Sequence, residues 1–255
     1  MDVLACLKRV PETGAKIVLT DDQQDIDTTN LGFTMSPHEE CAVEEAVQIT
    51  EDGGHSTALT LGPEEAKEQV RTAVAMQIDE GILLETDGGE WGPRDTAAAI
   101  ADFVRERAEN GDGYDLLLFG NESADTGNYQ VGIRVAEALG LPVISSIKSL
   151  EIDGDTAIAK REIARGSEVY EIELPAVVAV KEGLNEPRYA SMRARMQARN
   201  QEIESITPER TTEPGLEKKQ LESPETEKGQ AEILGEGTDA VPAVMDVLRE
   251  ELEVI

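Results

Sequence analysis

Apolar and polar positions along the first 150 residues follow a pattern that switches repeatedly between strand and helix. Five short apolar runs have the length and composition of buried strands: 3–7, 56–62, 81–85, 114–120 and 142–147. The spacing of apolar residues between them predicts helices that begin at Pro37 and at Pro63 and that cover 95–109 and 130–139. Strands that alternate with helices in this way predict an α/β fold with a doubly wound, mostly parallel sheet.

Local signals mark two of the helix ends. Ser36 and Glu39 are spaced as a capping box, and Pro37 occupies the first helical position between them. Gly140 follows the last apolar residue of the helix over 130–139, where glycine can adopt the left-handed conformation that ends a helix. These signals place the start of the first helix and the end of the fourth.

The pattern changes after the fifth strand. Residues 149–163 contain two alternating stretches around Asp153-Gly154, which predicts an added β-hairpin, and 169–180 supply a further strand or two. Beyond about residue 205 the chain becomes polar and rich in proline and glutamate, which is typical of an extended C-terminal arm, closed by a short amphipathic helix over 240–252. We therefore expect a folded domain over 1–204 and an arm over 205–255.

Composition limits the partners of the chain. It contains 53 acidic and 23 basic residues, a net charge of −30, and the acid is spread along its length. Bulk attraction to nucleic acid or to an anionic membrane is excluded, because both are polyanions. An acidic surface of this kind is typical of a halophilic protein in a high-salt cytoplasm, where salt screens the repulsion.

Other features indicate a cytoplasmic protein. Cys6 and Cys41 form no Cys-x-x-Cys pair and fall in an expected strand and an expected helix, which suggests buried thiols in a reducing compartment. Met1 leads directly into a strand, so no signal peptide is expected. No apolar run approaches the roughly 18 residues that a membrane span requires, so direct membrane insertion is not expected.

The fold directs attention to the carboxyl ends of the strands, where open parallel sheets bind ligands. The first strand ends at Cys6-Leu7-Lys8, the second at Leu61-Gly62-Pro63, and the fourth in the long polar loop 120–132. Glycines in that loop and the helix after it could direct backbone N–H groups at a phosphate. The alternative is a solvated connection with turn glycines, and neither the P-loop nor the dinucleotide fingerprint is present.

Catalytic chemistry is scarce in the sequence. The chain contains two histidines, His38 and His55, and neither has a partner at the spacing of a metal site or a catalytic triad. The Gly-x-Ser-x-Gly pattern of a nucleophile elbow is missing as well. We therefore expect a protein that holds a nucleotide, with no catalytic residue and no metal.

Four stretches resemble one known family. They are LACLKRVPETGAKI (4–17), SPHEECAVEEAVQI (36–49), the loop GNESADTGNYQVG (120–132) and LNEPRYASMRARMQARNQEIE (184–204). The second is similar to an Asn-Pro-Phe-x-Glu-x-Ala-Val-Glu-Glu-Ala helix, and the fourth matches a long signature with uncommon residue pairs. On these residues the chain resembles, over its whole length, the beta subunit of an electron transfer flavoprotein.

The resemblance implies a fold, cofactors and partners. The fold is a Rossmann-like sheet of the adenine nucleotide alpha hydrolase type, and the protein is an electron carrier rather than an enzyme. Its partner is the electron transfer flavoprotein alpha subunit, which holds the redox FAD that the beta subunit helps to cover and which the arm is expected to contact. Electrons come from flavin dehydrogenases, such as the acyl-CoA dehydrogenases of fatty acid oxidation, and pass to a membrane electron transfer flavoprotein-quinone oxidoreductase.

A second nucleotide is also implied, AMP in simple carriers or a second FAD in electron-bifurcating members. Its expected contacts are Cys6, Pro37, His38, Glu39, Leu61, Asp125, Thr126, Gly127, Asn128, Tyr129, Gln130, Val131 and Gly132. The loop departs from the common family pattern by its Gly127 and Tyr129, and its Gln-Val-Gly ending is closer to the bifurcating branch. AMP is favoured and FAD stays open. His38 replaces a usual Phe beside the redox flavin, and Thr13 stands where some members have Tyr.

The resemblance also assigns a surface to partners. The expected recognition loop comprises Leu184, Asn185, Glu186, Pro187, Arg188, Tyr189 and Met192. Met192 corresponds to the apolar side chain that docks in a pocket of the dehydrogenase, and the alternative is that it packs inward on its own helix. Glu162 occupies an acidic position that pairs with a basic residue of the alpha subunit in the family.

Two other functions share this type of sheet. One is a stand-alone nucleotide sensor of the universal stress protein type, which needs neither the hairpin, nor the signature, nor the arm. The other is an adenylating hydrolase, which requires a Ser-Gly-Gly-x-x-Ser-like pyrophosphate loop that the sequence lacks. Co-purification with a flavin-bearing second chain separates the carrier from the sensor.

Overall fold

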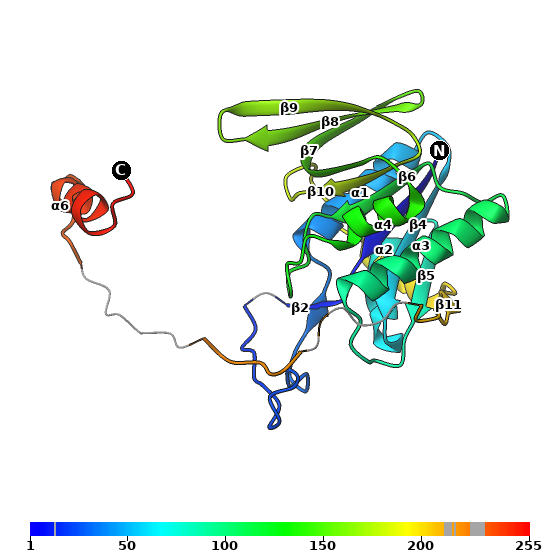
Figure 1. Ribbon diagram of the computed structural model, residues 1–255, viewed down its shortest axis with the longest axis horizontal. Coiled ribbons are helices and arrows are strands. Elements are labelled where there is room, and N and C mark those ends of the chain that lie inside the picture. Colours follow the sequence, from blue (N-terminus) through cyan, green and yellow to red (C-terminus); the bar gives the residue numbers. More distant parts are fainter. Residues whose placement is uncertain (13, 212–215, 217, 225–232) are drawn as a thin grey trace.

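The protein is built around one large twisted sheet (Figure 1). The computed structural model describes residues 1–255 with the exception of 13, 212–215, 217 and 225–232. Within these residues the sheet has nine strands, in the order β11 (Glu204–Ile206), β5 (Glu80–Glu85), β4 (His55–Gly62), β1 (Asp2–Leu7), β6 (Leu116–Gly120), β10 (Ala176–Val180), β7 (Val143–Asp153), β8 (Thr156–Ile163) and β9 (Gly166–Glu173).

The strands from β11 to β7 pair in parallel, and β7, β8 and β9 pair antiparallel. The chain runs outward from β1 through β4 to β5 and then crosses to β6 on the other side of β1. The strand order therefore reverses between β1 and β6, which is where doubly wound sheets form a crevice for ligands. The predicted Rossmann-like α/β fold is confirmed.

Helices cover both faces of the parallel part. One face carries α1 (Pro37–Thr50), α2 (Lys67–Ala75) with a preceding 3₁₀ turn (Glu64–Ala66), and α5 (Met192–Asn200); the other carries α3 (Pro93–Glu109) and α4 (Val131–Leu139). Side chains of β1 alternate between the two apolar layers, since Val3 and Ala5 pack with the α1 face and Leu4 and Cys6 with the α3 face. A fully apolar central strand is required for this arrangement.

The predicted helix ends are also found in the structure. Ser36 caps α1 through its side chain, and the Glu39 carboxylate accepts from the Ser36 N–H at 2.8 Å, which completes the capping box. Gly140 ends α4 with φ 69°, a left-handed conformation. The first helix therefore begins at the position that brings Glu39 to the end of β1.

The fifth predicted strand and the first arm of the predicted hairpin form one strand, β7. Its first half pairs with β10 and its second half with β8, and the direction changes near Ser146, which has φ 62°. The Oδ1 atom of Asn121 accepts hydrogen bonds from the Ser146 N–H and Oγ, both at 2.9 Å, and holds the bend. Beyond it, β7, β8 and β9 form a ribbon that projects from the sheet (Figure 1).

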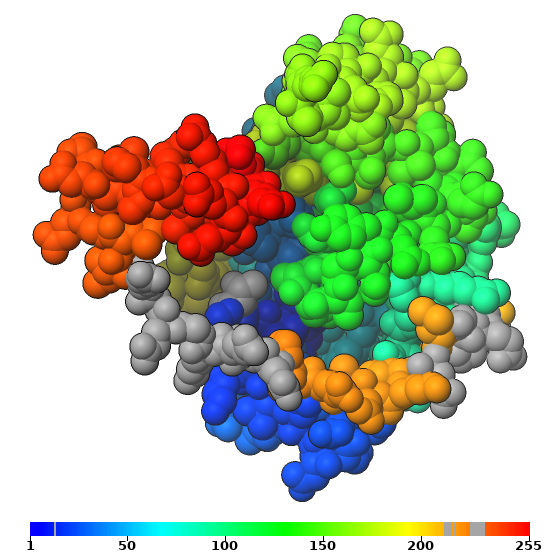
Figure 2. All heavy atoms as spheres, turned by 60° about the vertical axis from the view of Figure 1, so that its left-hand side comes forward, coloured from blue at the N-terminus to red at the C-terminus, as the bar shows by residue number. Residues whose placement is uncertain are grey.

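The first residues of the expected arm extend the sheet, because β11 pairs with β5. Further along, the Leu221 N–H donates to the Gln23 carbonyl at 2.8 Å, and Figure 2 shows this part of the arm crossing the N-terminal segment. A short helical segment follows near the C-terminus, with a 3₁₀ helix (Gly237–Ala240), α6 (Val241–Asp246) and a π-helix (Val247–Glu251). Two short strands, β2 (Val10–Pro11) and β3 (Phe33–Thr34), form a separate pair.

Candidate functional site

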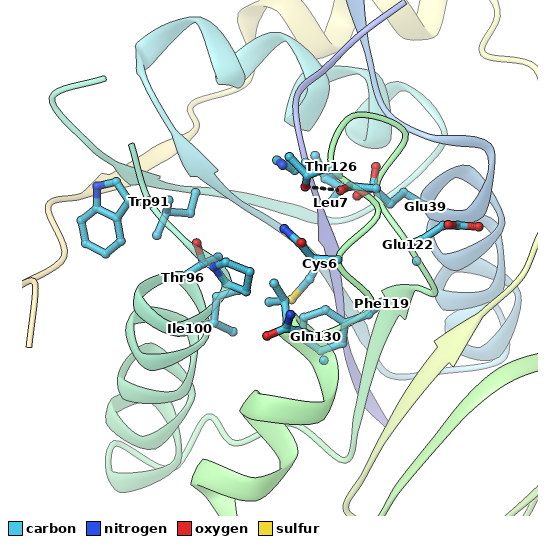
Figure 3. A pocket seen from close by; sticks show the side chains of 18 of the residues that line it. Cys6, Leu7, Glu39, Trp91, Thr96, Ile100, Phe119, Glu122, Thr126 and Gln130 are labelled. Atoms are coloured by element: carbon cyan, nitrogen blue, oxygen red, sulfur yellow. Dashed lines mark hydrogen bonds between the residues drawn. The ribbon is translucent and has the colours of Figure 1, made fainter. Parts of the chain in front are cut away.

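A cavity of about 400 Å³ opens at the carboxyl ends of four parallel strands, β1, β4, β5 and β6. It is lined by residues from the segments 6–9, 59–63, 86–93 and 119–133, from α3 and from the bend of β7, together with Glu39 and Ala179. Figure 3 shows Cys6, Phe119 and Gln130 near its centre, with Trp91 and Ile100 on one side and Glu39 on the other. The cavity lies at the point of strand reversal and has the size of a small-ligand site.

Two cations line this cavity in a strongly acidic chain. The Lys8 ammonium lies 2.6 Å from a carboxylate oxygen of Asp125, in the long loop after β6. The Arg9 guanidinium lies 3.3 Å from the centre of the Phe33 ring. Burial lowers the pKa of Arg9, and Glu65 acts against this shift. Lys8 and Arg9 are the groups of this wall that could contact an anionic ligand, and both have carboxylates nearby.

The loop after β6 leads into the N-terminus of α4 at the cavity. Gln130 is the N-cap residue of α4, and its side chain does not cap the first N–H groups of the helix. A Cβ on Gly132 would lie 3.1 Å from the Phe119 ring, so glycine allows α4 to begin against β6. Gly127 and Tyr129 have φ 53° and φ 56°, and for tyrosine this left-handed conformation is strained.

Cys6 and Glu39 form the base of the cavity and are both buried. Burial raises the pKa of the Glu39 carboxyl to about 8, against the effect of the Ser36 hydrogen bonds and of Lys8. Burial, and next the Glu39 charge, strongly raise the pKa of the Cys6 thiol. Cys6 is therefore a neutral thiol, suited to pack against a ligand and not to attack one.

His38 connects two loops beside the cavity. Its Nδ1 atom accepts from the Glu182 N–H at 2.6 Å, and its Nε2 atom lies 3.3 Å from a carboxylate oxygen of Glu122. An acceptor at Nδ1 places the proton of the neutral ring on Nε2, where it can be donated to Glu122. His38 thus joins the loop after β6 to the loop after β10, while its neighbour Pro37 begins α1.

The cavity includes several of the expected nucleotide contacts and places others next to it. Its lining contains Cys6, Glu39, Leu61, Thr126, Asn128, Tyr129, Gln130, Val131 and Gly132. Two further expected residues contact the lining. Asp125 pairs with the lining residue Lys8, and His38 contacts the lining residue Glu122. Thr13 lies outside the described residues.

Some lining residues were not anticipated from the sequence. They are the glycine-rich loop after β5 with Trp91, the cation Arg9, and Ser145 and Ser146 in the bend of β7. The carboxyl end of β5 obeys the same rule as the other strand ends, and this signal could have located the loop. The bend at Ser146 has no comparable signal, because its position depends on the distant Asn121.

The signature loop after β10 is fixed to α1 by an ion-pair network. The Glu44 carboxylate accepts from Arg188 at the backbone N–H (2.9 Å), Nε (2.8 Å) and Nη2 (3.0 Å). Arg188 also bonds Glu51 at 2.8 Å and contacts Gln77. The Asn185 amide donates to the Cys41 carbonyl and the Glu45 carboxylate. Arg188 and Asn185 therefore hold the loop against their own domain.

Other residues of this loop point outward. Tyr189 is 91 % exposed and Met192 is 75 % exposed, while Leu184 packs against the core and Glu186 and Pro187 are exposed. The alternative that Met192 packs inward on its helix is therefore wrong in this structure. Glu162 lies on the ribbon, 3.0 Å from the Lys148 ammonium, and two thirds of its side chain is exposed.

The described part of the chain has neither a cluster of metal ligands nor a membrane-spanning helix. It contains no group of three or more His, Cys, Asp or Glu side chains that could hold a metal ion. No helix among the described residues has both the length and the apolar composition needed to cross a bilayer. The second histidine, His55, lies at the opposite end of β4, near Asp79.

Comparison with known proteins agrees with this architecture. Residues 25–211 match the family model of the electron transfer flavoprotein domain. The chain is 32 % identical to the electron transfer flavoprotein subunit beta of Bacillus subtilis over the full length of both proteins. It is 36 % identical to that of Syntrophomonas wolfei, over 80 % of this chain and 78 % of the relative, and 32 % identical to that of Dictyostelium discoideum, over 82 % of each. The chain belongs to the electron transfer flavoprotein family and is a beta subunit.

Proposed function

We propose that this subunit binds one adenine nucleotide in the cavity at the strand ends and works in a heterodimer with the electron transfer flavoprotein alpha subunit. The redox FAD, which supplies the electron-transfer chemistry, is held mainly by the alpha subunit. The beta subunit contributes part of its cover, and His38 and the loops that it joins are its candidate residues for this contact. The arm beyond 205 is the candidate for contact with the alpha subunit.

The observation that carries the nucleotide proposal is the construction of the cavity. A helix N-terminus without a side-chain cap and two cations line one crevice, at the reversal of the strand order. Helix N-termini and cations favour phosphate, whereas the apolar wall around Leu61, Ile100 and Phe119 favours a base. The lining residues therefore fit a nucleotide, and AMP is our preferred ligand, with a second FAD as the alternative.

We further propose that Met192 docks in a pocket of the partner flavin dehydrogenases. Two observations on the signature loop support this proposal. Arg188 fixes the loop to the buried Glu44 of its own domain, whereas the Met192 side chain is exposed. An exposed apolar side chain on a firmly held loop can dock without a large ordering cost. Acyl-CoA dehydrogenases as donors, a membrane electron transfer flavoprotein-quinone oxidoreductase as acceptor, and a cytoplasmic location complete the proposal.

Ligand analysis of the native complex tests the nucleotide proposal. The co-expressed heterodimer is purified, its ligands are released by denaturation, and they are counted by mass spectrometry. One FAD and one AMP per heterodimer are expected, whereas two FAD would indicate an electron-bifurcating protein. Retention of only the single redox FAD, in a complex purified without nucleotide depletion, would contradict a nucleotide in this cavity.

A matched pair of variants locates the nucleotide. Arg9→Met removes a cation from the cavity wall, and Arg165→Met removes an exposed cation in the turn between β8 and β9. Both change the net charge equally, so bulk electrostatics cannot distinguish them. We expect the first to lower the AMP content of the complex and the second to leave it unchanged. Equal AMP contents would place the phosphate away from Arg9.

A further inference from the structure

The arm is bonded to the wall of the cavity at Arg210. The Arg210 Nε atom donates to a carboxylate oxygen of Asp95 at 2.9 Å, and its Nη2 atom contacts the same oxygen. Nη2 also donates to the Glu90 carbonyl at 2.8 Å, and the guanidinium lies 5.1 Å from the centre of the Trp91 ring. One arm side chain therefore holds three neighbouring residues of the segment 90–95.

The bond to Asp95 fixes Arg210 firmly. Asp95 lies in the first turn of α3, and only 2 % of its side chain is exposed. A buried carboxylate is costly without charged or hydrogen-bonded partners, and Arg210 supplies a charge and two donors. Because the anchoring carboxylate is buried, Arg210 has little freedom to move away from Trp91 and Glu90. The arm is consequently attached to the segment 90–95 through Arg210.

The bond matters for the cavity because the segment that it holds forms one of the cavity walls. Gly88, Gly89, Glu90, Trp91 and Gly92 all line the cavity. Glycine-rich loops have high conformational freedom, so the position of the single tryptophan of the chain depends on contacts outside the loop. Figure 3 shows Trp91 on the α3 side of the cavity, near Thr96 and Ile100. Arg210 supplies such a contact through the ring itself.

We propose that Arg210 is a positioning residue for the nucleotide, which holds Trp91 as a wall of the cavity and so links the arm to nucleotide binding. This inference rests on the proposed adenine nucleotide in the cavity. Trp91 offers a large aromatic surface, which suits a purine base. Since coupling between two binding events is reciprocal, a bound nucleotide also stabilises the arm at Arg210.

The first experiment compares Arg210→Lys with Lys219→Met in the complete heterodimer. Lysine keeps a positive charge for Asp95 but cannot bond Asp95 and Glu90 and cover Trp91 with one planar group. Lys219 is exposed in the same arm and serves as the control. AMP is titrated into nucleotide-depleted complexes by calorimetry, or FAD if the native complex yields a second FAD. We expect AMP to bind about tenfold more weakly to Arg210→Lys, which corresponds to about 1.4 kcal/mol, with wild-type affinity in the control.

A second measurement uses the reciprocal effect. Trypsin cleaves after arginine and after lysine, so the peptide bond that follows position 210 can be cut in the wild type and in Arg210→Lys alike. Saturating AMP should slow this cleavage in the wild-type complex only. Thermal melting of the nucleotide-depleted complexes shows whether the substitution has also damaged the fold. We expect the melting temperature of Arg210→Lys to stay close to that of the wild type.

The outcomes separate this inference from the proposed function. Wild-type affinity in Arg210→Lys, or cleavage that AMP does not slow in the wild type, overturns the role of Arg210 and leaves the nucleotide site intact. A parallel fall of melting temperature and affinity would show that Arg210 is structural, and would also overturn the inference. A wild-type complex that binds neither AMP nor FAD in addition to its redox flavin contradicts the proposed function itself.

Discussion

Substitution of Met192 by alanine should weaken the complex with partner dehydrogenases and leave the subunit folded. Met192 is the first residue of α5 and is 75 % exposed, whereas Ser191 caps the helix and the buried Ala198 packs it on the domain. Truncation therefore removes no core packing, and the free energy of unfolding should change by no more than about 0.5 kcal/mol. Burial of a methionine in a partner pocket is worth about 2 kcal/mol, which corresponds to roughly thirtyfold in affinity.

The assay pairs steady-state electron transfer with a melting curve. With an acyl-CoA dehydrogenase as donor, the Met192→Ala heterodimer should show an increased KM for the flavoprotein, with flavin content and melting temperature unchanged. Val169→Ala is the control, because Val169 is 58 % exposed on β9, away from the signature loop. The ratio of the KM of Met192→Ala to that of the wild type should not depend on salt concentration, because salt screens charges and Met192 is uncharged.

Three results would refute this reasoning. Normal transfer kinetics would place the docking site elsewhere, and a large fall of melting temperature would mean that Met192 supports the fold. A defect that changes strongly with salt would indicate that the partner contacts Arg193 or Arg195 instead. Each result is distinct from the others, because kinetics, melting and salt dependence are measured separately on one preparation.

Three further predictions concern charge. Arg188→Met should cost about 3 kcal/mol of unfolding free energy, because it leaves the buried Glu44 carboxylate without its cation; a loss below about 1 kcal/mol in chemical denaturation would contradict this. Glu39 has a folded-state pKa of about 8, above its ordinary value of 4.5, so its contribution to stability is lost as the pH rises between these values. Glu39→Gln should remove that part of the pH dependence, and identical slopes in both proteins would refute it. The net charge of −30 predicts a higher melting temperature in 1 M KCl than in 0.1 M KCl, because the Debye length falls from about 10 Å to about 3 Å, and a flat response would contradict it.

The strands and helices of the parallel sheet could be predicted because the spacing of apolar residues and the capping residues are local signals. Buried parallel strands must be apolar on both faces, and the capping box at Ser36 satisfies helix N–H groups from residues three positions apart. β11 was missed because a three-residue edge strand at the start of a polar segment has no periodicity to detect. The sequence pattern predicts two strands, 142–147 and the first half of the hairpin over 149–163, where the structure has the single strand β7, because a change of pairing partner within one strand leaves no periodic signal.

The site was predictable to the extent that it lies at strand ends. The loop after β6 and the residues Cys6 and Leu61 follow from the rule for parallel sheets. The bonds that fix the site do not follow from it: Arg188 is 144 residues from Glu44, and Arg210 is 115 residues from Asp95. A sequence pattern describes neighbours within one element, whereas these pairs depend on how distant elements pack. The resemblance supplied the role of the signature, and the structure divided its residues between anchors and exposed groups.

The bend in β7 has a mechanical consequence. Ser145 and Ser146 belong to the cavity wall, and the same strand continues without a break into the projecting ribbon. Asn121, which holds the bend, follows β6 and begins the loop that also lines the cavity. The ribbon is therefore one continuous strand away from the crevice. A protein bound to the far end of the ribbon would act on the cavity wall through this strand, while the apolar side chains of the ribbon hold it on the core of the domain.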